Sequence, residues 1–444
     1  MSLPAALRRR TEAGLLVLVG LVVGFAYALA SLGSSASLPA DVVPFLGVVL
    51  GLFVAAHVAV RRLAPRADPL LVPLAVLLNG LGYVFIARLD EELAGQQAAW
   101  TGVGVAAFVA TLAVVRRVRV LERLRYTVGL VGVLLLLAPL APGAGPAING
   151  SKIWVRIGPV GFQPGEFAKL ALAVFIAAYL VERRELLATA VRRIGPVRLP
   201  EPRHLAPLLV AWLFALVVMM FERDLGSALL FFVLFLTVTW VATGRAAYLV
   251  MGTGLFAAGA LLAWRLFSHV QVRVDMWLDP WQDPTGRGYQ IVQSAYALAW
   301  GGVGGTGLGL GIDGRIPYQE TDFIFAIVGE ELGLVGATAV VAAFVLLVGR
   351  GLHAASRIED PFAKLLACGL TTLLGVQAFL IMGGVTRLLP LTGVTLPFVS
   401  YGGSSLVSNW VLVALLVRVS DQGATEPVAE ASAQQVPATA GGPR

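Results

Sequence analysis

The sequence is poor in charged residues. Asp, Glu, Lys and Arg make up only 13% of its 444 residues, whereas a soluble domain has ~25%. Apolar residues make up 58% of the chain, and so many could not all find an interior in water. This composition excludes a soluble enzyme and a disordered chain. It indicates a polytopic membrane protein built from helices.

Cysteine and histidine are also scarce. Cys368 is the only cysteine, so neither an intramolecular disulfide nor a cysteine-ligated zinc or iron–sulfur site can form. The four histidines are scattered without ligand spacing. We therefore expect no resident metal site, while a divalent cation that assists the reaction stays an open alternative. In so apolar a chain, the net charge of +7 does not indicate a nucleic-acid partner.

Twelve apolar runs approach the ~20 helical residues that cross the hydrocarbon core of a bilayer. With the N-terminus inside, Arg and Lys gather in the inner connections loop by loop, as the positive-inside rule requires. This pattern predicts an all-α, multi-pass protein of the cytoplasmic membrane with both termini in the cytoplasm. The predicted spans cover residues 13–33, 42–60, 69–87, 98–115, 126–141, 166–181, 205–221, 225–243, 246–264, 322–349, 365–386 and 402–417.

The chain divides into three parts. We expect an N-terminal extension with two helices at 1–68, a core at 69–418 and a disordered cytoplasmic tail at 419–444. The first span also resembles a signal peptide, because three arginines precede it and small residues follow it. Its apolar stretch exceeds the ~7–15 residues of a signal-peptide core, which favours a retained helix.

The first long outer segment, 142–165, carries Lys152, Trp154 and Arg156. In the helix that follows, Glu166 and Lys169 are three residues apart and share one face. One interpretation is an ion pair near the membrane interface, with Trp154 as a belt aromatic. The other is a polar site at the helix mouth. Charges inside an apolar span are expensive, so we favour a site for Glu166 and Lys169, while both alternatives stay open for Trp154.

The second long outer segment, 265–321, is the richest in Asp, Arg and aromatic residues. Asp279 and Asp283 each precede a proline, a pattern typical of a turn or helix start. Taken alone, each is better explained as a helix cap than as a base. Arg287 follows within the same segment and could bind an anion.

Shorter outer segments hold further polar candidates. Arg223 and Asp224 lie in a tight turn, where Asp224 could simply cap the next helix. Asp322 opens the tenth span, which also carries Glu330 and Glu331; these are structural pairs or an anionic site. The glycine-rich run Gly301–Gly311 is no phosphate loop, because no Gly-Lys-Ser/Thr follows, and it predicts close backbone packing. Arg387 and Ser404 line the last outer loop and helix mouth.

Six sequence motifs in order resemble the SEDS family, the RodA/FtsW group of cell-wall glycosyltransferases. They span about residues 70–418, and their details are closest to the RodA branch of high-GC actinobacteria. That branch similarly has two additional N-terminal helices before a ten-helix core. The motifs lie at residues 150–154, 162–170, 224–228, 283–294, 321–333 and 397–405.

The resemblance implies a peptidoglycan glycosyltransferase that joins lipid II units into a glycan strand on the outer face of the cytoplasmic membrane. It implies inverting transfer, release of undecaprenyl pyrophosphate, and a role in cell elongation and shape. A class B penicillin-binding protein, the crosslinking transpeptidase, is the implied partner. The substrates and the growing strand are lipid-linked, so membrane lipids surround the site.

The resemblance also implies roles for residues. The essential Asp of the family falls on Asp283, the expected general base, and its Glu and Lys fall on Glu166 and Lys169. Its outer-loop Trp falls on Trp154, although the preceding residue is Ile153 rather than the frequent Arg. A Gly replaces the family's usual Ser before Glu166, which puts a role for that hydroxyl in doubt. Outer cations beside the carboxylates suit a phosphate-bearing ligand.

Two other functions stay open. A flippase for the same lipid would use Lys169, Asp322, Glu330 and Glu331 along a path across the bilayer. A scaffold that only recruits a partner would leave the outer charges without a purpose. The sequence favours the polymerase, because its polar motifs cluster on the outer side and its inner loops hold mostly simple Arg clusters.

Overall fold

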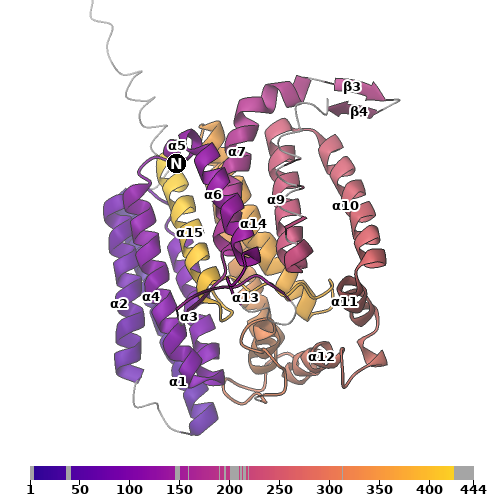
Figure 1. The fold of residues 1–444 in the computed structure, drawn as a ribbon. Helices are drawn as coiled ribbons and strands as arrows, with labels where there is room; N and C mark the ends of the chain where they lie inside the picture. The colour runs from indigo at the N-terminus through magenta and orange to yellow at the C-terminus, as the bar shows by residue number, and fades with distance from the viewer. Residues whose placement is uncertain are drawn as a thin grey trace, which may run out of the picture.

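The computed structural model describes residues 5–36, 42–145, 151–158, 160–189, 191–194, 197–200, 210, 213, 217–218, 220–312 and 314–424. Long helices run side by side and dominate this part of the chain (Figure 1). They are α1 (Ala5–Ser35), α2 (Val42–Leu63), α3 (Leu71–Leu89), α4 (Glu91–Val114), α6 (Arg125–Leu137), α7 (Gly165–Thr189), α9 (Leu225–Thr243), α10 (Ala246–Leu266), α13 (Ile324–Arg357), α14 (Pro361–Val385) and α15 (Gly403–Gly423).

Short elements join these helices. Two antiparallel hairpins occur, β1 (Val155–Ile157) with β2 (Val160–Phe162) and β3 (Val191–Ile194) with β4 (Val197–Pro200). The first hairpin lies within the segment 142–165. The short helices are α5 (Arg119–Arg123), η1 (Ala138–Leu140), α11 (Ser268–Leu278), η2 (Pro280–Gln282) and α12 (Tyr289–Gly301).

The chain is an all-helical, multi-pass membrane protein. Within the described residues, eight helices are long and apolar enough to cross a membrane. A helix covers each predicted span except 205–221, which lies largely outside the described residues. Helix α15 continues to Gly423, five residues into the predicted tail. The Ser420 hydroxyl accepts from the Asp68 amide at 2.9 Å, so this last turn is packed, and residues 425–444 lie outside the described residues.

Small residues let the helices approach closely. Helices α4 and α15 are tightly packed, and a Cβ on Gly104 would collide with the Trp410 ring, 2.5 Å away. The Trp410 indole is fully buried and donates to the Asn79 side chain of α3 at 2.9 Å. One buried tryptophan therefore joins three helices. Its ring also contacts that of Phe398, in the connection from α14 to α15, with the ring centroids 5.7 Å apart.

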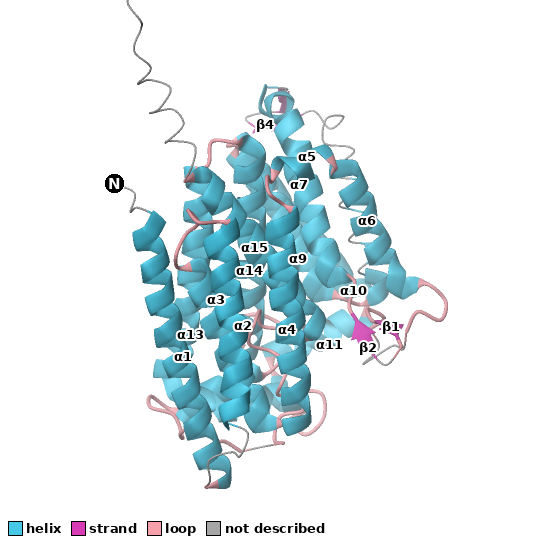
Figure 2. Ribbon diagram, turned by 90° about the vertical axis from the view of Figure 1, so that its left-hand side faces the viewer, coloured by secondary structure: helices cyan, strands magenta, loops and turns pink. Residues whose placement is uncertain are grey.

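The two ends of the bundle differ. The hairpin β1–β2 and helix α11 lie at one end (Figure 2), as do helix α12 and the connection from α14 to α15 (Figure 1). We call this the cavity end. The opposite end carries the Arg-rich connections and the hairpin β3–β4 (Figure 1).

Candidate active site

A cavity of about 1030 Å³ opens at the cavity end. Its walls come from α4, the β1–β2 hairpin, the first turns of α7, α9 and α15, helices α11 and α12, and the loop segments 318–322 and 391–395. Of the residues predicted from the sequence, six line it: Trp154, Glu166, Asp224, Arg287, Asp322 and Ser404. Residues far apart in the chain thus meet in one chamber.

Glu166 lies at the buried floor of this chamber, and Lys169 pairs with it from behind. The Lys169 ammonium donates to the Glu166 carboxylate at 2.6 Å and to the Gln377 side chain at 2.7 Å. The Ser408 hydroxyl donates to the same Glu166 oxygen at 3.0 Å. Lys169 does not line the cavity itself; it stands behind Glu166 and compensates its charge. A buried ion pair with every partner satisfied is rigid, because breaking it would leave a charge unpaired.

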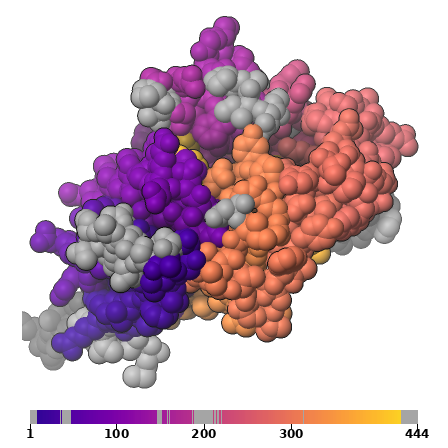
Figure 3. Space-filling view, turned by 90° about the horizontal axis from the view of Figure 1, so that it is seen from below, coloured from indigo at the N-terminus to yellow at the C-terminus, as the bar shows by residue number. Residues whose placement is uncertain are grey.

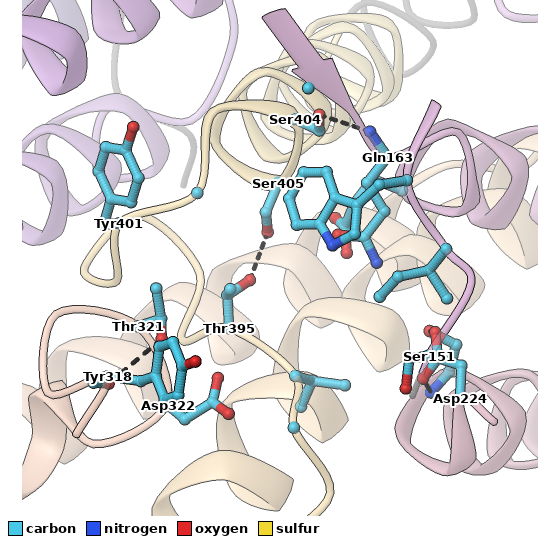
Figure 4. Close-up of a pocket in the computed structure, with 18 of the residues that line it drawn as sticks. Ser151, Gln163, Asp224, Tyr318, Thr321, Asp322, Thr395, Tyr401, Ser404 and Ser405 are labelled. Carbon is cyan, nitrogen blue, oxygen red and sulfur yellow. Dashed lines mark hydrogen bonds between the residues drawn. The ribbon is translucent and has the colours of Figure 1, made fainter. Parts of the chain in front are cut away.

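Hydroxyl groups continue this network along the wall (Figure 4). Ser404 accepts from the Gln163 amide at 3.0 Å, and Thr395 donates to Ser405 at 2.8 Å. The Gln377 side chain donates to the Thr395 carbonyl at 2.9 Å. These bonds tie the start of α15 to α7 and α14. Ser404 therefore positions the entry to α7, where Glu166 lies one turn further on.

Asp224 caps α9 as expected. Its carboxylate accepts from the Ser227 amide at 2.9 Å and from the Ser227 hydroxyl at 2.6 Å. Burial raises the pKa of Asp224, and the nearby Glu166 raises it further, while Arg273 lowers it. Asp224 therefore both caps α9 and lines the chamber.

Arg273 is a cavity residue that our sequence-based candidates did not include. It lies between Asp224 and Asp322, both of which interact with its charge, and it donates to the Leu391 carbonyl at 3.0 Å. Burial raises the pKa of Asp322 to about 6, against the effect of Arg273. Within the long segment 265–321, residues 268–278 form a helix. This helix, α11, places Val272, Arg273 and Met276 on the cavity side.

Asp283 lies beside the cavity and does not line it. Its carboxylate accepts from the Arg287 amide at 2.9 Å, and its carbonyl accepts from the Gly288 amide at 2.9 Å. Its geometry in this structure is thus that of a turn cap. The same hydrogen bond joins Asp283 to Arg287, whose side chain does reach the chamber. Asp279 caps η2 through the Trp281 amide at 3.1 Å.

Besides Lys169, four predicted cations lie outside the chamber. Lys152 is half-buried beside the hairpin, and Arg156 and Arg223 are exposed. Arg387 donates to the carbonyls of Trp277 and Leu278 at 3.2 and 3.3 Å. It therefore holds the end of α11, which carries Arg273, and has a structural role here.

Glu330 and Glu331 are structural carboxylates, the first of the two interpretations that the sequence left open. Glu331 pairs with Arg88 at 2.8 Å and accepts from the Gly309 amide at 2.9 Å. Glu330 accepts from the Ile312 amide at 3.3 Å. Both hold the glycine-rich segment against α13, which has a backbone break at Gly333 (φ 66°). The close backbone packing expected of that segment is confirmed.

Metal ligands do not cluster in the described part of the chain: no three His, Cys, Asp or Glu residues there lie close enough to hold an ion. The chemistry of the chamber is instead that of carboxylates, guanidinium groups, hydroxyls and two tryptophans, Trp100 and Trp154. Such a set binds sugars through stacking and hydrogen bonds, and phosphates through its cations.

Comparison with known proteins agrees with this chemistry. The family model described as cell cycle protein, for FtsW, RodA and SpoVE, matches residues 71–425. The chain belongs to this family. It is 45% identical to the peptidoglycan glycosyltransferase RodA of Mycobacterium tuberculosis, over 99% of this chain and 96% of the relative. The Mycobacterium leprae RodA is 46% identical, over 87% and 86% of the two chains.

Solved structures have the same fold. A chain from a peptidoglycan synthase complex that coordinates polymerization and crosslinking is 28% identical, with a TM-score of 0.66, covering 80% of this chain and 98% of that one. The crystal structure of the rod shape determining protein RodA of Thermus thermophilus is 26% identical, with a TM-score of 0.57, covering 80% and 96%.

Proposed function

We propose that the chain is a peptidoglycan glycosyltransferase that polymerises lipid II and releases undecaprenyl pyrophosphate. The observation that carries this proposal is the chamber itself, in which buried carboxylates, arginines and tryptophans face one open volume. The family and the RodA relatives support the same activity. The names of those relatives describe the same reaction, a glycosyl transfer that builds peptidoglycan.

The cavity end faces the outer side of the cytoplasmic membrane in this proposal. The Arg-rich connections at the opposite end then lie in the cytoplasm together with both termini, in line with the positive-inside rule. Twelve spans follow, with residues 205–221 as the seventh. The cell-elongation role rests on the similarity to RodA.

Asp283 is the general base of the transfer. It takes the proton from the acceptor sugar hydroxyl as that oxygen attacks the anomeric carbon of the donor, and such a base contributes ~10²–10⁴-fold. The bond from that carbon to the diphosphate breaks, with inversion. Because Asp283 accepts from the backbone of Arg287, the base and a cavity cation form one unit. Residues 286 and 288 are glycines where the chain packs closely: a Cβ at 286 would meet the Asp283 carboxylate at 2.5 Å, and one at 288 would overlap the Pro280 carbonyl.

The cations stabilise the leaving diphosphate. Arg273 and Arg287 line the chamber and face the charge that develops there, each contributing ~10²–10³-fold if it acts like an oxyanion donor. Asp224 and Asp322 hold Arg273 in place. Lys169 pairs with Glu166 at 2.6 Å, and Glu166 and Ser404 bind sugar hydroxyls beside the Trp154 ring.

Cations at the rim guide the substrate. Lys152, Arg156 and Arg223 attract the diphosphate of an approaching lipid, and membrane lipids surround its tail. A class B penicillin-binding protein is the partner that crosslinks the product, which the solved synthase complex supports by coordinating polymerization with crosslinking.

The flippase alternative has less support. Glu330 and Glu331, which it would use as a path, are occupied by Arg88 and by backbone amides of the glycine-rich segment. The test is to purify the full chain, supply labelled lipid II with and without the transpeptidase partner, and resolve glycan polymer by gel. Polymer supports the proposal. Movement of lipid II across vesicles without any polymer would replace it with the flippase.

A further inference from the structure

The first two helices lie outside the region that the family model matches, which begins at residue 71. They are nevertheless packed into the bundle. Along α1, the rings of Tyr27 and Tyr83 lie 6.2 Å apart, and a Cβ on Gly80 of α3 would collide with the Val23 side chain. Helix α1 therefore contacts α3 along its length, and its position depends on what holds its two ends.

The end of α1 away from the cavity is held by a buried polar cluster. The Glu12 carboxylate is fully buried and accepts from Arg9, and it contacts the His57 ring of α2 at 2.8 Å. Arg9 also donates to the Ala67 carbonyl, just before α3. Arg9 and Glu12 move together because both lie in α1, so the contacts that oppose sliding or rotation of the helix are those with His57 and with the Ala67 carbonyl.

The other end of α1 is seated on the glycine-rich segment 301–311. A Cβ on Gly33 would overlap the Leu308 carbonyl, and a Cβ on Gly309 would overlap the Ala30 carbonyl. The two backbones touch through a pair of glycines. Seen from the cavity end, the indigo N-terminal helices lie directly against the orange segment near residue 300 (Figure 3).

The same segment is fixed from its other side. The Gly309 amide donates to Glu331 at 2.9 Å, and Arg88 donates to the Gly311 carbonyl at 2.6 Å while pairing with Glu331. Helices α1, α3 and α13 thus meet at Gly309. We call this meeting point the Gly309 junction.

Both flanks of the braced segment form the chamber. Tyr318 and Asp322 line it on the side after the segment (Figure 4). Gln290 and Ile291, within α12, line it on the side before the segment. The candidate base Asp283 lies six residues before the start of α12 at Tyr289. A shift of the segment at the Gly309 junction would therefore move residues on both sides of the chamber.

We propose that α1 is a positioning element of the polymerase, which sets the place of the outer segment 283–322 through the contact of Gly33 with Gly309. The inference rests on the proposed glycosyltransferase function for its kinetic test. It gives the N-terminal extension a role in catalysis beyond anchoring, because an error of ~1 Å in the position of reacting groups can cost ~10²-fold in rate.

The test compares two glycine-to-alanine changes in the same helix. A Cβ added at Gly14 has no atom within 4 Å, whereas at Gly33 it displaces the segment. Gly33→Ala should lower kcat for lipid II polymerisation about 10- to 100-fold per folded molecule, with KM within about twofold. Gly14→Ala should keep wild-type kcat. Wild-type kcat in a folded Gly33→Ala variant would overturn the proposal.

Hydrogen exchange separates positioning from a loss of folding. In folded Gly33→Ala, amides at 286–294 and 305–322 should exchange faster while those of α14 stay unchanged; uniform acceleration would indicate a merely structural role and overturn the proposal. If that variant does not fold, wild-type exchange decides: slow exchange at Gly309 supports bracing, and exchange within seconds contradicts it. These exchange measurements do not require activity. If the wild-type protein made no polymer, that result would refute the proposed function, and the exchange measurements would still test the positioning role of α1.

Discussion

The two ends of the bundle use buried charge in opposite ways. At the end away from the cavity, Arg418 donates to the carbonyls of Leu63, Leu112 and Val115 and pairs with Asp421, so its partners all lie within the protein. At the cavity end, Arg273 and Asp322 keep part of their surface toward an open chamber. Charge in a membrane protein is costly in both places. It stabilises the fold where its partners are internal, and it serves chemistry where its partner is a ligand.

The largest expected effect comes from a substitution at the end away from the cavity. Replacing Arg418 by Met should lower the free energy of unfolding by about 3–5 kcal/mol, because three carbonyls and Asp421 lose their donor. Thermal unfolding in detergent measures it. Polymerisation per folded molecule should stay at the wild-type level; a specific loss of kcat would show that this end also serves catalysis.

The next effect concerns the cavity end. Arg273→Gln should reduce polymerisation about 10²–10³-fold, because the leaving diphosphate loses a preorganised cation. Its unfolding midpoint should fall less than that of Arg418→Met, since Asp224 and Asp322 can take up protons once Arg273 is gone. The kinetic assay is run on folded protein. Equal kcat in Arg273→Gln and wild type would remove Arg273 from the site.

A smaller effect depends on pH. The pKa of Asp322 is raised to about 6 by burial, so its carboxyl is neutral below that pH and ionised above it. Inorganic pyrophosphate should therefore inhibit more strongly as the pH falls through 6, because a negative charge beside Arg273 disappears.

Asp322→Asn provides the control for this pH effect, since protonation of pyrophosphate itself affects both proteins equally. As the pH falls through 6, the inhibition constant of pyrophosphate should decrease about tenfold more in the wild type than in Asp322→Asn, which corresponds to ~1.4 kcal/mol. Parallel pH profiles for wild type and variant would contradict a role of Asp322 at the anion site.

The smallest effect is at an exposed pair. Arg119 and Asp360 are 2.9 Å apart, but the Arg119 side chain is 69% exposed. Arg119→Gln should change the free energy of unfolding by less than ~1 kcal/mol, as solvent screens such pairs. If Arg119→Gln lowered the free energy of unfolding as much as Arg418→Met, exposure would not explain which charged residues stabilise the fold.

Much of the fold could be predicted from the sequence, because apolar runs and basic loops report the membrane directly. The chamber could be predicted only in part. Asp224 and Ser404 appeared as candidates through motifs, but Arg273 was missed because its helix is short and polar. The roles of Glu331 and Arg387 depend on backbone partners far away in the chain, and no spacing in the sequence reveals such partners.

The cavity-end account is tested most directly by one matched pair of variants, Asp283→Asn and Asp279→Asn. Both retain an oxygen that can accept the backbone hydrogen bond, from Arg287 and Trp281 respectively, so neither cap need be lost. Glycan polymer formed from lipid II is measured for each purified full-length protein. Asp283→Asn should lose ~10²–10⁴-fold in rate while Asp279→Asn stays near wild type. Polymerisation by Asp283→Asn at the wild-type rate would contradict the assignment of the base.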